Sequence, residues 1–342
     1  MAHSAKVNRR RVEGESQVKL ASFAFQGKER IGVAISDDTL VDLADAAAHV
    51  GRGPDDAPAD MIALIESGDA GQSLLTDIAD GLSHAPDHFS WIDAGHVEWR
   101  PPVRRPSKIV GIAMNNSASD ARKISAPDHP LMFLKPASCL IGHGQAIEAR
   151  AYYGSVHPEP ELGVVIGKTC RDVKAENAME CVYGYTIFND MTGNGMRAED
   201  MVHYWALYPS KDDPNQVEKR EQHLSYTARY KGSDTFGPMG PYLVTKDEVP
   251  DPHALEVRCW HKDDLIAEDS TAFYTYSIPQ VIEFVTRYHS LWPGDVISMG
   301  TAFRPGGARR PLHTANVTAL GGPVRVEITG LGVLENPVLQ TG

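Results

Sequence analysis

Four cysteines stand in a chain of 342 residues, and no two of them have the C-x-x-C spacing of a thiolate metal site. We therefore expect neither a disulfide framework nor a cysteine-ligated zinc, which fits a reducing, cytoplasmic location. No apolar run reaches the roughly 18 residues of a membrane-spanning helix. Residues 1–17 are polar and lack the apolar core of a secretory signal, so we expect a mobile tail there.

Basic residues are fewer than acidic ones, which gives a formal net charge of -12. This balance argues against a general nucleic-acid binder or a protein of anionic membrane surfaces. The chain has no G-x-G-x-x-G motif after an apolar strand, and no phosphate-binding P-loop. The partner that we expect is a small molecule.

Two units are expected after the tail. Residues 18–104 form a small N-terminal domain, with apolar strands around the turns "QGKE" and "SDDT", helical spacing over residues 57–85, and a proline-rich end. Residues 105–342 form the larger domain, where strand-like runs are interrupted by the helical stretches "KAENAMECV" and "SIPQVIEFVTRYHSL". Residues 209–230 are polar and predict a surface excursion. Such runs of strands with few helices indicate an α+β, mainly β fold.

The stretch "HPEPELGVVIG" places two glutamates, Glu159 and Glu161, just before an apolar run. On a strand these side chains would share one face, about 7 Å apart at Cα, where two ionised carboxylates repel each other unless a proton or cation lies between them. The next strong strand ends in a third carboxylate, Asp190. Three carboxylates without a thiolate or imidazole indicate a site for Mg²⁺, Mn²⁺ or Ca²⁺.

With these motifs the chain resembles the fumarylacetoacetate hydrolase family over about residues 18–340. The resemblance implies a mixed β-roll catalytic domain, a homodimer, and Glu159, Glu161 and Asp190 as ligands of a divalent cation. It implies 2-oxo or 1,3-dicarbonyl acids as substrates. The matching segments are "FLKPASCLIGHG", "PEPELGVVIG", "VYGYTIFNDM", "KGSDTFGPMGP", "LWPGDVISMGTA" and "VRVEITGLGVLENPV".

Four further residues are expected at the substrate. Lys135 interrupts an apolar strand, and Lys231 lies in a matching family segment, so both are predicted to add positive charge around a carboxylate or an oxyanion. Thr301 follows an apolar strand and is predicted to donate to a substrate carboxylate. Asn115 lies in a segment that we expect to contact the substrate's tail.

One departure from the family concerns the general base. Family hydrolases carry a His–Glu pair after the strand that corresponds to "VGIAM", but here Ser117 and Asp120 stand near those positions. A serine has no basic group to activate water. Either another histidine replaces the base, or metal-bound hydroxide acts, or the reaction needs no water activation. The histidine candidates are His143, His157, His203 and His223, of which His157 is favoured because it lies beside Glu159.

These patterns predict a metal-dependent enzyme, with hydrolytic C–C cleavage of an acylpyruvate-like substrate slightly ahead. A lyase or isomerase reaction of the same family, such as dehydration of a 2-oxo-3-deoxy sugar acid or decarboxylation of a 2-oxo acid, is the alternative. A non-catalytic ligand-binding relative is the second alternative.

Overall fold

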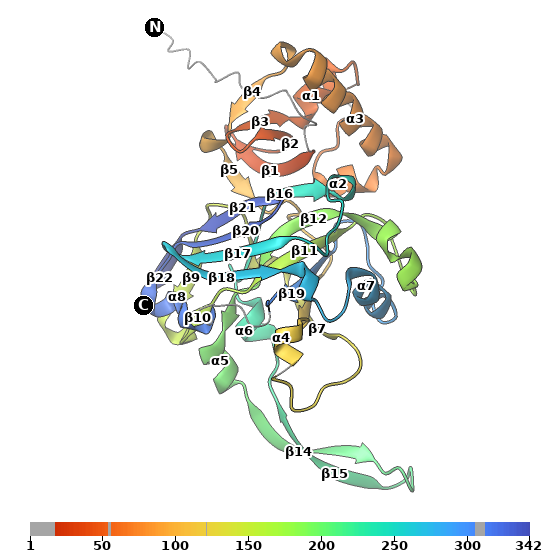
Figure 1. The fold of residues 1–342 in the computed structure, drawn as a ribbon, viewed down its shortest axis with the longest axis vertical. Coiled ribbons are helices and arrows are strands. Elements are labelled where there is room, and N and C mark those ends of the chain that lie inside the picture. The colour runs from red at the N-terminus through yellow and green to blue at the C-terminus, as the bar shows by residue number, and fades with distance from the viewer. Residues whose placement is uncertain (1–17, 54–55, 121, 305–311) are drawn as a thin grey trace.

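The computed structural model describes residues 18–53, 56–120, 122–304 and 312–342 (Figure 1). The predicted mobile tail, residues 1–17, lies outside them. The fold is α+β and dominated by strands, as predicted. Its largest element is a twelve-stranded sheet, whose main path runs β4-β3-β2-β1-β16-β12-β11-β19-β6-β7. Among the described residues, no helix has both the length and the apolar character that crossing a membrane requires.

As far as it is described, the N-terminal unit contributes five strands, three α-helices and two short 3₁₀ helices. Both predicted turns are confirmed, because β1 and β2 are joined at Gln26 and Gly27, and β2 and β3 at Asp37 and Asp38. The predicted helical region holds two of the helices. The elements are β1 (Lys19–Phe25), β2 (Lys28–Ser36), β3 (Thr39–Asp42), α1 (Leu43–His49), α2 (Met61–Glu66), α3 (Asp69–His84), η2 (Pro86–His88), β4 (Trp91–Asp93), η3 (Ala94–His96) and β5 (Glu98–Arg100).

The sheet continues across the predicted boundary at residues 104 and 105. Strand β1 pairs antiparallel with β16 (Gly237–Thr245), with Lys19 opposite Val244 and Leu20 opposite Leu243. One cluster of buried hydrophobic side chains likewise contains residues of both units, for example Leu20 and Val296. The strands of the N-terminal unit therefore belong to the same large sheet as the central strands of the larger unit.

The centre of the sheet is a triplet of buried antiparallel strands. Strand β11 (Pro160–Ile166) lies between β12 (Val182–Asn189) and β19 (Val296–Thr301), and nearly all of their residues are buried because both faces of the sheet are covered. Their apolar runs reflect this environment. Next to β19 follow β6 (Ile109–Ala113) and β7 (Leu131–Lys135).

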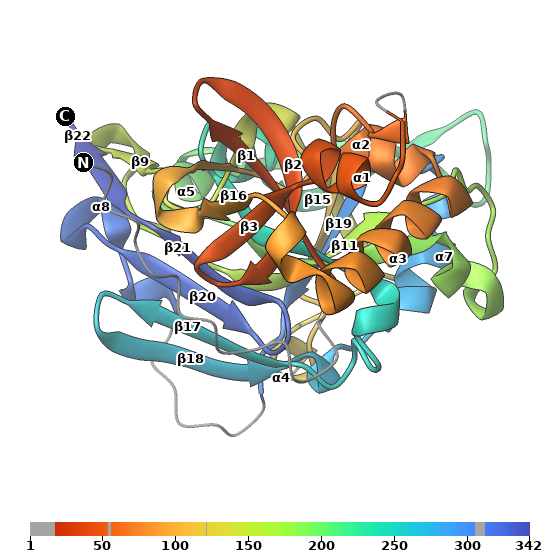
Figure 2. The ribbon, with the colours of Figure 1, turned by 90° about the horizontal axis from the view of Figure 1, so that it is seen from above.

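A second sheet has the order β18-β17-β20-β21, and Figure 2 shows its strands side by side. The predicted helix at residues 277–291 is confirmed as α7 (Ile278–Thr286), which has Pro279 in its first turn and ends before residue 291, whereas "KAENAMECV" forms the 3₁₀ helix η6. The remaining elements are α4 (Ser117–Asp120), η4 (Ala137–Cys139), β8 (Leu140–Ile141), β9 (Ile147–Arg150), η5 (Ala151–Tyr153), β10 (Val156–His157), η6 (Ala175–Cys181), β13 (Thr192–Gly193), α5 (Asn194–Glu199), α6 (Ala228–Gly232), η7 (Lys246–Glu248), β17 (Glu256–His261), β18 (Asp264–Ser270), η8 (Thr271–Phe273), α7 (Ile278–Thr286), η9 (Leu312–Thr314), α8 (Val317–Leu320), β20 (Val324–Ile328), β21 (Gly332–Asn336) and β22 (Val338–Thr341).

The predicted surface excursion belongs to a hairpin that projects from the body (Figure 1). Its strands, β14 (Val202–Pro209) and β15 (Val217–Leu224), pair over their whole length. The hairpin starts earlier than the predicted excursion, and it exposes apolar side chains such as Trp205 and Leu207.

Candidate active site

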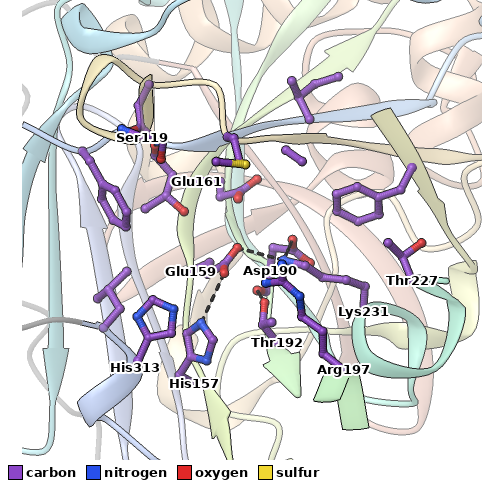
Figure 3. Close-up of a pocket in the computed structure, with 18 of the residues that line it drawn as sticks. Ser119, His157, Glu159, Glu161, Asp190, Thr192, Arg197, Thr227, Lys231 and His313 are labelled. Carbon is purple, nitrogen blue, oxygen red and sulfur yellow. Dashed lines mark hydrogen bonds and ion pairs between the residues drawn. The ribbon is translucent and has the colours of Figure 1, made fainter. Parts of the chain in front are cut away.

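The cavity that holds the predicted metal ligands has a volume of about 280 Å³ (Figure 3). It opens between the carboxyl end of β6, the start of β11, and the helices α5 and α6. Its size is near the lower end of the roughly 300–1,000 Å³ typical of small-molecule sites, which suits a small acid. The residues that line it include Asn116, Ser119, Arg122, His157, Glu159, Glu161, Asp190, Arg197, Tyr230, Lys231, Thr301 and His313.

The three predicted carboxylates lie together in this cavity. One potential ligand atom from each of Glu159, Glu161 and Asp190 falls within 4.8 Å of the other two. The pairing of β11 with β12 brings them together, because Pro160 lies opposite Asn189 and the chain reaches Asp190 directly afterwards. The prediction that Glu159 shares a strand with Glu161 needs correction.

Glu159 lies just before β11, where hydrogen bonds to the end of β12 hold its backbone. Its N–H donates to the Asn189 Oδ1 at 3.0 Å, and its carbonyl oxygen accepts from the Asp190 N–H at 2.8 Å. The proximity of the three carboxylates is therefore a consequence of strand pairing across the chain, and not of the i, i+2 spacing alone.

Glu161 is buried and held by hydrogen bonds from β19. Its Oε2 accepts hydrogen bonds from the Ser298 hydroxyl and from the Gly300 N–H, the latter at 3.0 Å. Burial and the neighbouring charge of Asp190 raise the pKa of Glu161 well above its ordinary value. Without a cation nearby, this carboxyl therefore tends to hold a proton.

Glu159 behaves in the opposite way. Burial opposes its ionisation, but the Lys231 ammonium and the hydrogen bond with His157 outweigh burial, and the pKa of Glu159 is lowered. Burial likewise opposes the charge on Lys231, yet Asp190 and Glu159 raise the pKa of Lys231. The Lys231 Nζ donates to Glu159 Oε2 at 2.8 Å and to Asp190 Oδ2 at 2.5 Å. This lysine is thus a fixed cation in the cavity wall, and its predicted role at the substrate stays a prediction.

Lys135 has a different position from the one predicted. Its side chain is fully buried and is absent from the cavity lining, and its Nζ donates to Asp190 Oδ1 at 2.5 Å and to the Phe236 carbonyl at 3.1 Å. A further bond goes to the Lys231 carbonyl oxygen. Lys135 therefore lies behind Asp190 and orients it, so a direct contact with substrate is not supported.

His157 is at the site, but its ring is already committed to other groups. It is fully buried, and its Nε2 lies 3.2 Å from Glu159 Oε1, while the Asn194 amide nitrogen lies 3.4 Å from its Nδ1. Since that amide nitrogen can only donate, Nδ1 accepts and Nε2 carries the proton towards Glu159. His157 therefore positions a carboxylate, and the prediction that it is a base loses support.

The histidine that the sequence reasoning missed is His313. Its ring packs against His157 with 4.5 Å between centroids, and it lines the cavity from η9. Burial, and then the neighbouring His157, lower the pKa of His313, which favours the neutral imidazole. Because no recognisable motif surrounds His313, the sequence did not single it out as a site residue. The other candidates lie elsewhere: His203 stacks on His223 in the hairpin, and His143 packs against Trp99.

The segment after β6 also departs from expectation. Ser117 and Asp120 are exposed and are not among the cavity-lining residues; Asp120 instead binds Lys123 and Thr275. Asn115 is buried, and its side chain bonds to backbone groups of Tyr276 and Met299. It therefore has a structural role, and its predicted contact with substrate needs correction.

Asn116 and Ser119 line the cavity in place of these residues. The short helix α4 turns Ser119 inward and Ser117 outward, which the sequence pattern did not reveal. Thr301 lines the cavity from the end of β19, and its predicted hydrogen bond to a substrate carboxylate stays a prediction.

Charge and donor type in the cavity fit a divalent cation. Three carboxylates and two lysine ammonium groups leave one negative charge when all are ionised, and a divalent cation would turn that into one positive charge. All the clustered donors are hard carboxylate oxygens, which prefer Mg²⁺, Mn²⁺ or Ca²⁺. Each also has an anchoring donor, Lys135, His157 or Ser298, as is usual behind metal ligands.

Comparisons with known proteins agree with this site. Residues 108–339 match the model of the family described as "Fumarylacetoacetate (FAA) hydrolase C-terminal". The chain is 31% identical over 285 residues to a mitochondrial oxaloacetate tautomerase of Bos taurus, which covers 82% of this chain and 80% of that protein.

Among solved structures, the chain is similar to a maleylpyruvate hydrolase from Sphingobium sp. SYK-6 in complex with manganese (II) ion and pyruvate. The identity is 27%, the TM-score is 0.66, and the match covers 95% of this chain and 100% of that one. A 5-carboxymethyl-2-hydroxymuconate delta-isomerase from Mycobacterium smegmatis has the same fold, with 24% identity, a TM-score of 0.62, and coverage of 95% and 99%.

Proposed function

The chain belongs to the fumarylacetoacetate hydrolase family, and we propose that it is a divalent-metal-dependent enzyme that isomerises a 2-oxo acid through its enolate. The observation that carries this proposal is the cluster of three carboxylates in one cavity with a buried lysine and the imidazole of His313. Keto–enol or double-bond isomerisation needs one group that moves a proton and one centre that holds the enolate oxygen.

Glu159, Glu161 and Asp190 are the proposed ligands of Mg²⁺ or Mn²⁺. The bound cation would polarise the 2-oxo oxygen and stabilise the enolate. Lys231 adds a fixed positive charge beside the same oxygen, and its hydrogen bonds to two of the carboxylates hold it there. Thr301 offers a hydroxyl to the substrate's carboxylate.

His313 is the proposed proton carrier. The neutral imidazole takes a proton from the carbon beside the carbonyl, and the electron pair of that C–H bond moves onto the carbonyl oxygen. The imidazolium then returns the proton to the oxygen, which gives the enol, or to another carbon of the conjugated system. No water is consumed, so this step needs no general base with an orienting carboxylate.

Isomerisation is favoured over hydrolysis because it needs no activated water. The Ser117 and Asp120 side chains are exposed outside the cavity, and His157 is engaged at both nitrogens. A dedicated water-activating pair is therefore missing among the described residues. The tautomerase names of the curated relatives point the same way.

Hydrolytic C–C cleavage, which the sequence favoured, is the second candidate. It is supported by the similarity to the maleylpyruvate hydrolase, which covers nearly all of both chains. Dehydration and decarboxylation would use the same enolate. A non-catalytic ligand-binding role would need the same cavity without proton transfer.

Deuterium exchange separates these possibilities. The Mn²⁺-loaded protein is incubated in D₂O with pyruvate or 2-oxobutyrate, and loss of the C3 proton signal is followed by NMR. We expect exchange without cleavage, and His313→Gln should lose the exchange while keeping Mn²⁺ affinity. His203→Gln, in the distant hairpin, is the matched control.

Two outcomes would overturn parts of the proposal. Release of pyruvate from an acylpyruvate, with no exchange in either 2-oxo acid, would establish hydrolysis instead. Unchanged Mn²⁺ binding in both Glu161→Gln and Asp190→Asn would remove the metal site. The homodimer that the family resemblance implies stays a prediction, which analytical ultracentrifugation can check.

A further inference from the structure

We propose that His203 and His223 form a binding site for Zn²⁺, or for a related transition-metal ion, on the hairpin of β14 and β15, with Glu221 orienting His203. An ion bound there would clip the two strands together. Among the described residues that line the carboxylate cavity, none of these three is present. The site is therefore separate from the cavity and does not depend on the proposed reaction.

Strand pairing places the two histidines side by side. His203 of β14 lies directly opposite His223 of β15 in the antiparallel register. Side chains at directly opposed positions have Cβ atoms about 4.5–5.5 Å apart and point to the same face of the ribbon. The two imidazole rings are stacked, with 3.9 Å between their centroids and 12° between their planes. Two potential metal ligands therefore meet at one point of the hairpin.

The separation of the rings suits two bonds to one ion. Zinc–nitrogen bonds are about 2.0–2.1 Å long, so one ion can join two nitrogens that lie up to about 4 Å apart. The 3.9 Å between the ring centroids falls within that reach. Both histidines are exposed, so their rings can turn towards a shared ion without displacing a buried group.

Glu221 supplies the carboxylate that usually stands behind a metal-bound histidine. It precedes His223 by two residues on β15, so its side chain lies on the same face of the hairpin. Its Oε1 lies 2.5 Å from the Nε2 of His203. Because a carboxylate accepts, Nε2 carries the proton, and the lone pair of the neutral ring is left on Nδ1. Ligating histidines typically donate their other N–H to a carboxylate in this way, which fixes the tautomer.

The donor atoms differ from those of the cavity, and so does the ion that they should prefer. Imidazole nitrogens suit Zn²⁺, Cu²⁺ and Ni²⁺, whereas carboxylate oxygens suit Mg²⁺ and Mn²⁺. The cluster in the cavity consists of carboxylates. An excess of Mg²⁺ can therefore compete for the carboxylates without occupying the imidazoles, and a His203 variant should leave Mn²⁺ binding in the cavity unchanged.

An ion at this place would stabilise an element that has little support of its own. Strands β14 and β15 form a sheet of two strands that projects from the body (Figure 1), and such hairpins are marginally stable in water. On the face that carries His203, Trp205 and Leu207 are each 62% exposed. An ion that joins His203 to His223 binds the paired hairpin and not an open one, so it shifts the equilibrium towards pairing.

The test is a Zn²⁺ titration of the full chain, without an added histidine tag, in a large excess of Mg²⁺. Binding is measured by calorimetry, and hydrogen exchange of the hairpin is measured by mass spectrometry. We expect exchange in residues 202–224 to slow roughly tenfold when free Zn²⁺ is ten times its Kd. His203→Gln and His223→Gln should each lose this effect, because one imidazole cannot join the strands. Glu221→Gln should keep the site but lower its affinity by about tenfold or more.

Two control variants accompany these. His96→Gln removes an exposed imidazole that lies 3.2 Å from the Asp93 carboxylate, outside the hairpin, and this variant should bind Zn²⁺ as the unchanged protein does. Leu207→Gln removes an exposed apolar side chain from the same face of the hairpin and keeps both imidazoles, so its response to Zn²⁺ should persist. Comparing exchange with and without Zn²⁺ within each variant separates a lost ion from a hairpin that was already open.

Four results would overturn the proposal. If the unchanged protein binds no Zn²⁺ under these conditions, the two rings have a packing role alone. Equal Zn²⁺ affinity in the double variant of His203→Gln and His223→Gln would place the ion elsewhere. Binding that leaves hairpin exchange unchanged would show that the ion does not join the strands. An equal loss of the response in Leu207→Gln would show that Zn²⁺ needs an intact hairpin surface and not the imidazole pair.

Discussion

Replacing Lys135 by methionine should destabilise the metal-free protein much more than the metal-loaded protein. The lysine is fully buried, and its ammonium is shared between Asp190 and two backbone carbonyls. Methionine fills a similar volume without the charge. The carboxylate cluster then carries two uncompensated negative charges when ionised, in place of one.

The size of the effect follows from what is left unpaired. Removing one partner of a buried ion pair typically costs about 3–5 kcal/mol. With about 2.1 cal/mol/K per residue for the unfolding entropy, 342 residues give a shift of about 1.4 °C per kcal/mol, and hence a fall of about 4–7 °C in Tm. A divalent cation would compensate Asp190, so the unpaired carbonyls remain as the main loss, about 1–3 kcal/mol or about 1–4 °C.

The assay is thermal unfolding of Lys135→Met and the unchanged protein, with EDTA and with saturating Mn²⁺, together with a separate titration of Mn²⁺ affinity. Lys108→Met is the matched control. Its Nζ lies 2.7 Å from Asp295 Oδ2, and Asp295 is fully buried away from the cavity. The loss in that variant should not depend on Mn²⁺.

Two results would refute this reasoning. One is a difference in Tm between Lys135→Met and the unchanged protein that is the same with EDTA and with Mn²⁺. The other is unchanged stability combined with lost pyruvate binding. The second result would return Lys135 to the substrate contact that the sequence predicted.

Three further predictions concern residues around the cavity and at the edge of the large sheet. Gly300→Ala should lower Mn²⁺ affinity and cost roughly 2 kcal/mol or more, because φ is +88° and a Cβ would lie 2.7 Å from the Ile112 carbonyl oxygen; unchanged metal titration would contradict this. Asn115→Ala should cost about 1–3 kcal/mol in denaturant unfolding while pyruvate binding persists, since it orphans buried backbone groups. Burial lowers the pKa of His143 in the folded protein. The contribution of this histidine to the free energy of unfolding is therefore complete above the pKa of the unfolded chain, near 6.5, and is lost as the pH falls from 6.5 towards the folded-state pKa. Urea unfolding between pH 5 and 8 should show this slope flattened in His143→Gln; an equal slope in both proteins would exclude His143 as its source.

The sequence alone determined the parts that depend on local pattern. The apolar runs of β11 and β12 specify buried strands, the proline in the first turn of α7 marks a helix start, and the turns at residues 26–27 and 37–38 define hairpins. These signals are readable because they repeat with the period of the element or depend on residues with a restricted backbone. The three carboxylates could be named because each follows or begins such a run.

Only the tertiary structure decided which side chains share the cavity. Lys135 and Lys231 both stand in family-like segments, yet one lies behind Asp190 and the other beside it, because strand β7 and helix α6 approach Asp190 from different sides. The short helix α4 places Ser119, and not Ser117, in the cavity wall. His313, Arg122 and Arg197 line the cavity from three distant segments, and no local pattern encodes this placement, because it depends on how the chain closes around the carboxylates.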